Sequence, residues 1–458
     1  MFKESFFSRM PRLSDDTIAV LEQPVSQTEV EEATDKLNPV SGSFLCTVCQ
    51  LRLTRALPGY VMGTDHMNGA VRGYLKEDLD TKAMPKHLSR MIVHFSIDLH
   101  RELLKTRDQR NNTIYSPYSV ATGLSMALAG ARGKTAEELL SVIRTKDENV
   151  HDKFASFFPK LSNQKLQFYV ANRIYSDLKF PVVDECAVFL NSTYSSNIVS
   201  VDFQNKSESV RVQINDWIKE ATGSKITDLL APGSVGPTTS VILVNTIYFR
   251  GLWESPFSAD KTSRRDFHVN ASTKVQVDMM CQKEDFAITH SEELAARAIE
   301  MPYKGGRASM VVLLPDAIDG LSYLEHHLSH HKLSAVLADL KETPNVELSM
   351  PKLLLRQSFS LKNTLMTMGV NDLFTEKCDL SGMFKAGKPS VSDIIHEACL
   401  QVDEEGMEAA AATAVTGAGS AAPAATQTTE FLVDHPFMLF ILRGKSDMVL
   451  FMSSVRNP

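Results

Sequence analysis

The sequence predicts one large α+β domain. Apolar residues recur at helical spacing early in that domain, around residues 91–103. Continuous apolar runs of strand length dominate its middle and its end. The chain has 458 residues, of which 43% are hydrophobic and 22% are charged, so it can bury a large core. Helices first, then helices and strands together, then strands alone is an order typical of the α+β class.

Helix signals begin just after residue 88. Four apolar residues share one face of the first expected helix: Ile92, Phe95, Leu99 and Leu103. Residues 124–128 belong to a second helix, which ends at the glycines of residues 130–133. Thr135 and Glu138 have the spacing of a capping box, which predicts the start of a third helix. A further short helix is expected over residues 361–368, where a glycine ends it.

Strand signals are strongest in the second half of the chain. Val241–Phe249 is a continuous apolar run, typical of a strand that is buried on both faces. His396–Gly406 alternates apolar and polar residues, as a half-buried strand does. Further apolar runs predict strands at Met310–Leu314, Val346–Met350, Phe431–Val433, Phe437–Leu442 and Met448–Met452.

The chain divides near residue 88. Residues 1–88 are weakly periodic and contain scattered prolines, so we interpret them as a poorly ordered N-terminal extension that need not belong to the mature protein. Residues 89–458 form the folded domain. The N-terminus lacks the apolar run of a secretory signal, and no stretch is apolar enough to cross a membrane. The net charge of −7 argues against a nucleic-acid partner.

Several short motifs do not support an enzyme or a metal site. Residues 417–422 fit a dinucleotide-binding glycine pattern, but Pro423 interrupts the helix that must follow. Cys46 and Cys49 have zinc-like spacing without a second pair. The four histidines between His326 and His331 fit an exposed helix surface better than a metal site. We therefore expect no catalytic residue, no metal and no cofactor.

The segment Met407–Thr426 is the most unusual part of the chain. Ten of its twenty residues are alanine, and none is basic, aromatic, leucine or isoleucine. Predicted strands flank it on both sides, and long loops in compact domains are usually functional. With a period of two, alternate residues from Met407 to Gly417 form a small, apolar face, and Glu408 lies on the other face. The segment can therefore be a loop in one state and a strand in another. A disordered linker fits less well, because few residues follow.

Residues 89–458 resemble the serpin family, over essentially the whole of that family's fold. The resemblance rests on motifs that occur in the family's order, at Ser116–Ser119, Val244–Phe257, Met301–Tyr303, Leu313–Pro315, Met350–Lys352, Met368–Val370, Asp434–Phe437 and Asn457–Pro458. It implies helices packed around a large central mixed β-sheet, with further sheets and an exposed reactive-centre loop at about residues 406–430.

The resemblance also implies a function. A serpin of the inhibitory kind is a suicide substrate: a serine protease cleaves its loop, and the loop enters the central sheet while the covalent acyl complex persists. The native state is then kinetically trapped. We expect a monomer whose partner is the target protease. A non-inhibitory serpin that acts as a carrier, a chaperone or a protease substrate, and an inhibitor of a cysteine protease, are the alternatives.

The resemblance assigns the hinge of the loop to Glu404, Glu405, Gly406, Met407, Glu408, Ala409, Ala410, Ala411 and Ala412. Gly406 lets the backbone pivot without steric cost. The alanines can enter a sheet without a cavity larger than a methyl group, whereas a proline or an inward charge would oppose entry. Met407 is larger than the residue common in inhibitory members, but it is flexible and apolar.

Two counts give two candidates for the reactive bond. Counting from the hinge places it at Ser420–Ala421, and counting back from His435 places it at Ala425–Thr426. We prefer Ser420–Ala421, because the length inserted before the bond decides how tightly the protease is pulled. Either bond offers a small residue, and the loop has no lysine or arginine. An elastase-like protease with a small pocket is therefore the expected target.

The resemblance assigns two further groups of residues. Ser116, Ser119, Asn245 and His396 match the shutter, where strands part, and Trp253 and Glu404 match the breach, where the loop first enters. Hydroxyls, an amide and an imidazole can form one hydrogen-bonded cluster there. Polar residues that are merely satisfied in the core, and a tryptophan that only fills space, are the alternatives.

The cellular location stays open at this point. Asn111, Asn191, Asn205 and Asn270 lie in glycosylation sequons. Family habit and these sequons favour secretion into the extracellular space as a glycoprotein. The missing signal and six cysteines that form no evident disulfide framework favour the cytoplasm.

Overall fold

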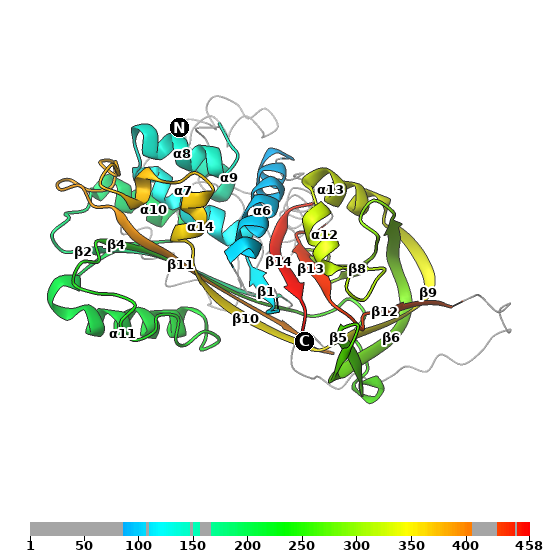
Figure 1. Cartoon of the computed structure of the whole chain (residues 1–458). Helices are drawn as coiled ribbons and strands as arrows, with labels where there is room; N and C mark the ends of the chain where they lie inside the picture. Colours follow the sequence, from blue (N-terminus) through cyan, green and yellow to red (C-terminus); the bar gives the residue numbers. More distant parts are fainter. Residues whose placement is uncertain (1–85, 107–109, 147–149, 156–165, 405–427, 445–446) are drawn as a thin grey trace, which may run out of the picture. The chain divides into compact units, whose positions relative to one another are not determined.

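The computed structural model describes residues 86–106, 110–146, 150–155, 166–404, 428–444 and 447–458. The chain divides into two units between Ala83 and Met84, and the described residues belong to the second unit, Met84–Pro458. Almost all of the expected N-terminal extension therefore lies outside them. The described residues are drawn in colour in Figure 1.

The first helices follow the apolar pattern of the sequence. Helix α6 (Lys86–Thr106) buries its predicted face, because Ile92, Phe95, Leu99 and Leu103 are at most 2% exposed. Helix α7 (Pro117–Gly130) begins with Pro117, and the Ser116 hydroxyl caps it by accepting a hydrogen bond from the Ser119 N–H (3.1 Å). A Cβ atom at Gly130 would lie 2.4 Å from the Cβ of Met383, so only glycine fits at this helix end. These predictions are confirmed.

The predicted capping box is wrong. Helix α8 (Gly133–Val142) begins two residues before Thr135, and its N-cap residue, Arg132, makes no side-chain cap. The Thr135 hydroxyl accepts a hydrogen bond from the Asp379 N–H (3.0 Å), and Glu138 accepts two from the backbone of Asn371 and Asp372. Both side chains bind a distant loop instead of their own helix, which local spacing cannot reveal.

The remaining helices are short, apart from α11. They are α9 (Val150–Ala155), α10 (Asp184–Tyr194), α11 (Phe203–Ala221), α12 (Leu321–His327), α13 (His330–Asp339), α14 (Lys362–Thr367) and two 3-10 turns at Ala259–Lys261 and Asp372–Phe374. The predicted short helix over residues 361–368 is confirmed as α14. The histidines expected on one helix surface are divided between α12 and α13. None of the helices in the described ranges has the length and apolar character that a bilayer crossing requires.

A large sheet takes most of its strands from the second half of the domain. Its strands are β1 (Thr113–Tyr115), β5 (Ser263–Asn270), β6 (Thr273–Ser291), β7 (Ala296–Pro302), β8 (Ser309–Pro315), β9 (Lys341–Pro351), β12 (Thr429–Leu432), β13 (Phe437–Leu442) and β14 (Val449–Val455). The predicted apolar runs correspond to β8, β9, β12, β13 and β14. Every residue of β13 and β14 is buried, as their continuous apolar runs require.

A second, five-stranded sheet has the order β10-β11-β4-β2-β3. Its strands are β10 (Leu353–Ser360), β11 (Val391–Val402), β4 (Val241–Gly251), β2 (Leu166–Asp177) and β3 (Ile198–Val201). The pairs β11–β4 and β2–β3 are parallel, and the other two are antiparallel. The expected α+β architecture with a mixed sheet is confirmed.

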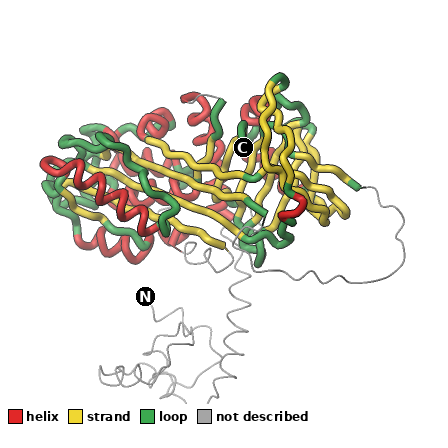
Figure 2. The backbone as a smooth tube through the Cα atoms, turned by 90° about the horizontal axis from the view of Figure 1, so that it is seen from below, coloured by secondary structure: helices red, strands yellow, loops and turns green. Residues whose placement is uncertain are grey.

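The two faces of the five-stranded sheet contact different layers. In β4, Leu243, Ile247 and Phe249 belong to the main core. Val244 and Tyr248 point the other way and join a smaller core with residues of α11. Seen from below, a helix lies across the strands of this sheet (Figure 2), and Figure 1 labels it α11. We call the side toward the main core the inner face and the side toward α11 the outer face.

Candidate functional site

The middle of the five-stranded sheet contains a parallel pair. Strands β11 and β4 pair in register from Ile394 opposite Leu243 to Leu400 opposite Phe249. We call this line of contact the β4–β11 seam. The segment after β11 would have to fold back to enter the seam, so it would run antiparallel to β11 and also to β4. One inserted strand would thus replace a parallel pair with two antiparallel pairs, which are slightly more stable per residue.

Four polar side chains meet on the inner face of the seam. The Ser116 N–H donates to His396 Nε2 (3.0 Å), and His396 Nδ1 hydrogen-bonds Asn245 Oδ1. Asn245 Nδ2 donates to the backbone oxygen and to the hydroxyl of Ser119, both at 2.8 Å. We call Ser116, Ser119, Asn245 and His396 the inner cluster. The structure thus brings together the four residues that the sequence assigned to the shutter.

The inner cluster fixes the chemical state of its histidine. A backbone N–H can only donate, so Nε2 of His396 must accept, and the proton lies on Nδ1. The ring is fully buried, and burial lowers the pKa of His396 to about 3. The imidazole is therefore neutral at physiological pH, as its hydrogen bonds require.

Two partners of the inner cluster were missed by the sequence analysis. Asn172 lies opposite Asn245 in the β2–β4 pair and accepts a hydrogen bond from its amide. The Ser116 hydroxyl donates to the carbonyl oxygen of Leu450 in β14 (2.5 Å). No local sequence pattern indicates either partner, because both are brought to the cluster by strands that are distant in the chain.

A second group of contacts holds the end of β11, next to the hinge. The Trp253 indole N–H donates to the carbonyl oxygen of Asp403 (2.9 Å), and the indole stacks on Tyr303 with ring centroids 4.4 Å apart. Glu404 pairs with Lys352 (2.6 Å), and its backbone oxygen accepts from the Phe257 N–H (2.9 Å). Of the two predicted breach residues, Trp253 thus binds Asp403, and Glu404, which the sequence also assigned to the hinge, is held by Lys352 and Phe257.

Lys352 was the missed residue here. It lies in the Met350–Lys352 motif, but no local pattern indicated its partner. Burial raises the pKa of the Glu404 carboxyl, and hydrogen bonds from Lys352 and Thr262 outweigh burial, so the pKa lies below its ordinary value. Glu404 is therefore ionised and fixed by an ion pair.

The other predicted loop residues lie outside the described part of the chain. They are the hinge residues Glu405, Gly406, Met407, Glu408, Ala409, Ala410, Ala411 and Ala412, and the bond candidates Ser420, Ala421, Ala425 and Thr426. On the far side, Lys283 Nζ donates to the Thr428 hydroxyl (2.9 Å), and β12 begins at Thr429 and pairs with β9. The residues on either side of the segment 405–427 are thus both held by side-chain contacts: Glu404 by Lys352, and Thr428 by Lys283.

The four sequon asparagines are all on the surface. Asn111, Asn191, Asn205 and Asn270 are exposed. Asn191 Nδ2 donates to Asn197 (2.8 Å), and Asn205 bonds to Asp202, which caps its helix. Each of these side chains is therefore accessible to solvent in the folded domain.

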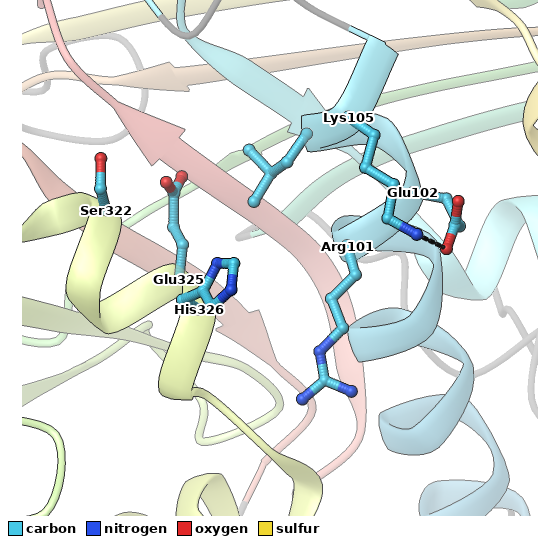
Figure 3. Close-up of a pocket in the computed structure, with 7 residues that line it drawn as sticks. Arg101, Glu102, Lys105, Ser322, Glu325 and His326 are labelled. Atoms are coloured by element: carbon cyan, nitrogen blue, oxygen red, sulfur yellow. Dashed lines mark hydrogen bonds and ion pairs between the residues drawn. The ribbon is translucent and has the colours of Figure 1, made fainter.

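A separate cavity of about 320 Å³ lies between α6 and α12. Figure 3 shows its lining, in which Lys105 pairs with Glu102 (2.5 Å) beside Arg101. Glu325 also lines it, but both of its carboxylate oxygens accept hydrogen bonds from Arg456 at 2.7 Å. The cavity is therefore lined by charges that already have protein partners.

The fold and the site together define a narrow structural class. It is an α+β domain whose mixed sheet contains a parallel seam, with a tethered segment at the end of that seam. The model of the family described as "Serpin (serine protease inhibitor)" matches residues 90–458. The chain belongs to the serpin family.

Individual relatives agree with this assignment. Iris from Ixodes ricinus is 46% identical over 377 residues, which are 82% of this chain and 100% of Iris. Human leukocyte elastase inhibitor is 36% identical over 383 residues, which are 81% of this chain and 100% of that protein. Among solved structures, human thyroxine-binding globulin in complex with its ligand is similar with a TM-score of 0.74 and 26% identity, covering 82% of this chain and 100% of that one.

Proposed function

We propose that this protein is a suicide-substrate inhibitor of serine proteases, not an enzyme, and that it traps its target by inserting the cleaved loop between β4 and β11. The observation that carries this proposal is the parallel β4–β11 seam, whose β11 end leads directly into the segment 405–427. The alanine-rich composition of residues 407–426 supports it, because small side chains can enter a sheet without enlarging it.

The proposed chemistry uses the protease's own first step. The target's catalytic serine attacks the carbonyl of Ser420, an acyl ester forms, and the peptide that begins at Ala421 leaves as the amine. The inserting strand then carries the ester away from the position where water would hydrolyse it. Each new backbone hydrogen bond contributes about 1 kcal/mol net, and an internal strand makes them on both sides.

We propose an elastase-like target. Ser420 and Ala425 are both small, and residues 405–427 contain no lysine or arginine, so a protease with a deep acidic pocket would find no partner. The relative named leukocyte elastase inhibitor supports this choice. A pocket built for a large apolar residue would also stay unfilled.

The test is incubation of the full chain with neutrophil or pancreatic elastase, followed by a denaturing gel and N-terminal sequencing of the released peptide. We expect a band at the summed mass that survives boiling and a peptide that starts at Ala421. A peptide that starts at Thr426 would move the bond to Ala425. Cleavage without a complex, repeated across a panel of serine and cysteine proteases, would contradict inhibition.

The α6–α12 cavity favours a second candidate, a non-inhibitory carrier. Thyroxine-binding globulin is a structural neighbour that is complexed with a small molecule. However, the volume of about 320 Å³ lies at the lower end of typical ligand pockets, and Arg101, Glu102, Lys105 and Glu325 in its lining are charged. A carrier should keep the same melting temperature after loop cleavage, whereas an inhibitor that inserts its loop should not.

We further propose secretion as a monomeric glycoprotein, with the cytoplasm as the alternative. The exposure of the four sequon asparagines supports this location. Treatment of the natural protein with an N-glycosidase should lower its mass. An unchanged mass would favour the cytoplasm.

A further inference from the structure

We propose that a chain of polar side chains on the outer face of the seam limits the rate at which the sheet opens for the loop. Its members are Tyr248 and Arg250 of β4, Gln401 of β11 and Asp403 just beyond β11; we call them the outer chain. The proposal rests on the proposed function, because it concerns the same opening of the β4–β11 seam.

The outer chain is continuous across the seam. The Tyr248 hydroxyl donates to Gln401 Oε1 (3.2 Å), which is a contact from β4 to β11. Gln401 Nε2 donates to Asp403 Oδ2 (3.0 Å). Arg250 Nη2 donates to the same oxygen (2.8 Å), which returns the chain to β4. Two of its three bonds therefore cross from one strand to the other.

The outer chain and the inner cluster lie on opposite faces. Asn245 and Tyr248 are an odd number of positions apart in β4, as are His396 and Gln401 in β11. Tyr248 packs in the core beneath α11, and Asn245 contacts Ser119 of α7. The seam is thus bridged by side chains on both of its faces.

The buried position of Tyr248 keeps its hydroxyl protonated, so that it can donate the hydrogen bond across the seam. Its side chain is only 1% exposed, and burial raises its pKa to about 12, so the hydroxyl keeps its proton and donates. The Tyr248–Gln401 hydrogen bond is partly buried, and breaking a bond of this kind costs about 1 kcal/mol net. Opening of the seam must therefore overcome this bond before the loop can supply new ones.

The contact can exist only before insertion. Neighbouring strands lie about 4.8 Å apart, so an inserted strand would move β4 and β11 to about 9.6 Å. A hydrogen bond of 3.2 Å between their side chains cannot survive that separation. The ion pair of Arg356 and Glu397 differs, because it joins β10 to β11, which stay together. Tyr248 and Gln401 therefore stabilise the uninserted state alone.

A hydrogen bond that slows insertion affects which fraction of the acyl-enzyme complex is trapped and which fraction is hydrolysed. After acylation the complex is either hydrolysed or trapped, and the trapped fraction grows with the rate of insertion. Weakening the outer chain should speed insertion and raise the trapped fraction, while lowering the stability of the uninserted state. Tyr248 is thus a positioning residue that touches no substrate.

The test is Tyr248→Phe in the full chain, with Tyr169→Phe as the matched control. Tyr169 lies opposite Tyr248 in the β2–β4 pair, with ring centroids 6.0 Å apart, but on the side of β4 away from the seam. The probe is uptake of a synthetic peptide with the sequence of residues 407–420. We expect about five-fold faster uptake in Tyr248→Phe, which corresponds to one neutral hydrogen bond of typical net strength. Tyr169→Phe should match the wild type.

A second readout separates this role from simple packing. The melting temperature of the uncleaved Tyr248→Phe protein should fall, and that of the loop-cleaved protein should equal the wild type. Gln401→Met, which removes the acceptor from the β11 side, should give the same pattern. Equal uptake in Tyr248→Phe and wild type, or an equal fall of both melting temperatures, would overturn the proposal.

The outcomes also separate this inference from the proposed function. If the wild type takes up peptide but traps no protease, inhibition fails and the inference stands on the uptake rates. If the wild type takes up no peptide and its melting temperature does not change on cleavage, the seam does not open and both proposals fall.

Discussion

At the scale of single residues, the site depends on a few buried polar groups whose state the structure fixes. His396 is neutral because a backbone N–H occupies its Nε2 atom and because the ring is out of water. Glu404 is charged because Lys352 pairs with it. The sequence identified His396 and Glu404 by resemblance, but their ionisation followed only from their partners.

His396 predicts a dependence of stability on pH. Its folded-state pKa of about 3 lies below the value of about 6.5 for an unfolded histidine, so the unfolded state takes up the proton first. The contribution of His396 to the free energy of unfolding is fully present above about pH 6.5. It declines as the pH falls toward 3, by at most about 1.4 kcal/mol per pH unit. Urea unfolding between pH 7.5 and 5 measures the slope. His396→Gln cannot titrate and should show a shallower slope; an equal slope would contradict the prediction.

The ion pair of Lys352 and Glu404 leads to a prediction about stability at the C-terminal end of β11. Lys352→Met removes the partner of Glu404, and Lys352 is 39% exposed, so solvent screening limits the loss to about 1 kcal/mol. We expect a lower melting temperature of the uncleaved protein and faster loss of inhibitory activity on warming. Lys352→Arg, which keeps the charge, is the control. The prediction fails if both variants behave alike.

At the scale of elements, strand β4 was predicted well because its apolar run is long, and β11 was predicted as a strand but with wrong bounds. The alternation in His396–Gly406 predicted a half-buried strand, whereas β11 spans Val391–Val402 and also buries Glu397 and Cys399 on its other face. The capping box failed at the same scale, because Thr135 and Glu138 bind a loop that begins more than two hundred positions later. A local pattern cannot reveal a competing distant partner.

The period of two in the loop gives a prediction for this element. Ala411 belongs to the face expected to enter the sheet, and Ala410 belongs to the opposite face. Ala411→Arg should therefore convert the protein from an inhibitor into a substrate, because a charge cannot be buried without a partner. Densitometry of the covalent complex should show at least about a ten-fold loss, and Ala410→Arg should retain most of the complex. Equal effects of the two would show that the loop does not insert as a regular strand.

At the scale of the whole molecule, the native fold leaves one favourable pairing unused. The five-stranded sheet has a parallel pair at β4–β11, and the chain that could fill it begins at the end of β11. The inner cluster and the outer chain bridge the seam from its two faces. Under the proposed insertion, both groups would hold the uninserted state against an inserted state that has more hydrogen bonds.

This arrangement predicts a large thermal effect. Ten new hydrogen bonds at about 1 kcal/mol each, with about 2 °C per kcal/mol for a domain of this size, raise the melting temperature by on the order of 20 °C after loop cleavage. Calorimetry of the protein before and after limited proteolysis measures the shift. Ala411→Arg supplies the control, because it is cleaved without inserting. A flat result for the wild type would instead favour the carrier.

The sequence by itself determined the α+β class, the main helices and strands, the alanine-rich segment and the family. These features depend on periodicity and on motifs, which are properties of residues close together in the chain. Only the tertiary structure decided that β4 lies beside β11, that Asn172 lies opposite Asn245, and that Tyr248 reaches Gln401. Strand order and register join segments far apart in sequence, and a side chain acquires its partner and its pKa only when they are joined.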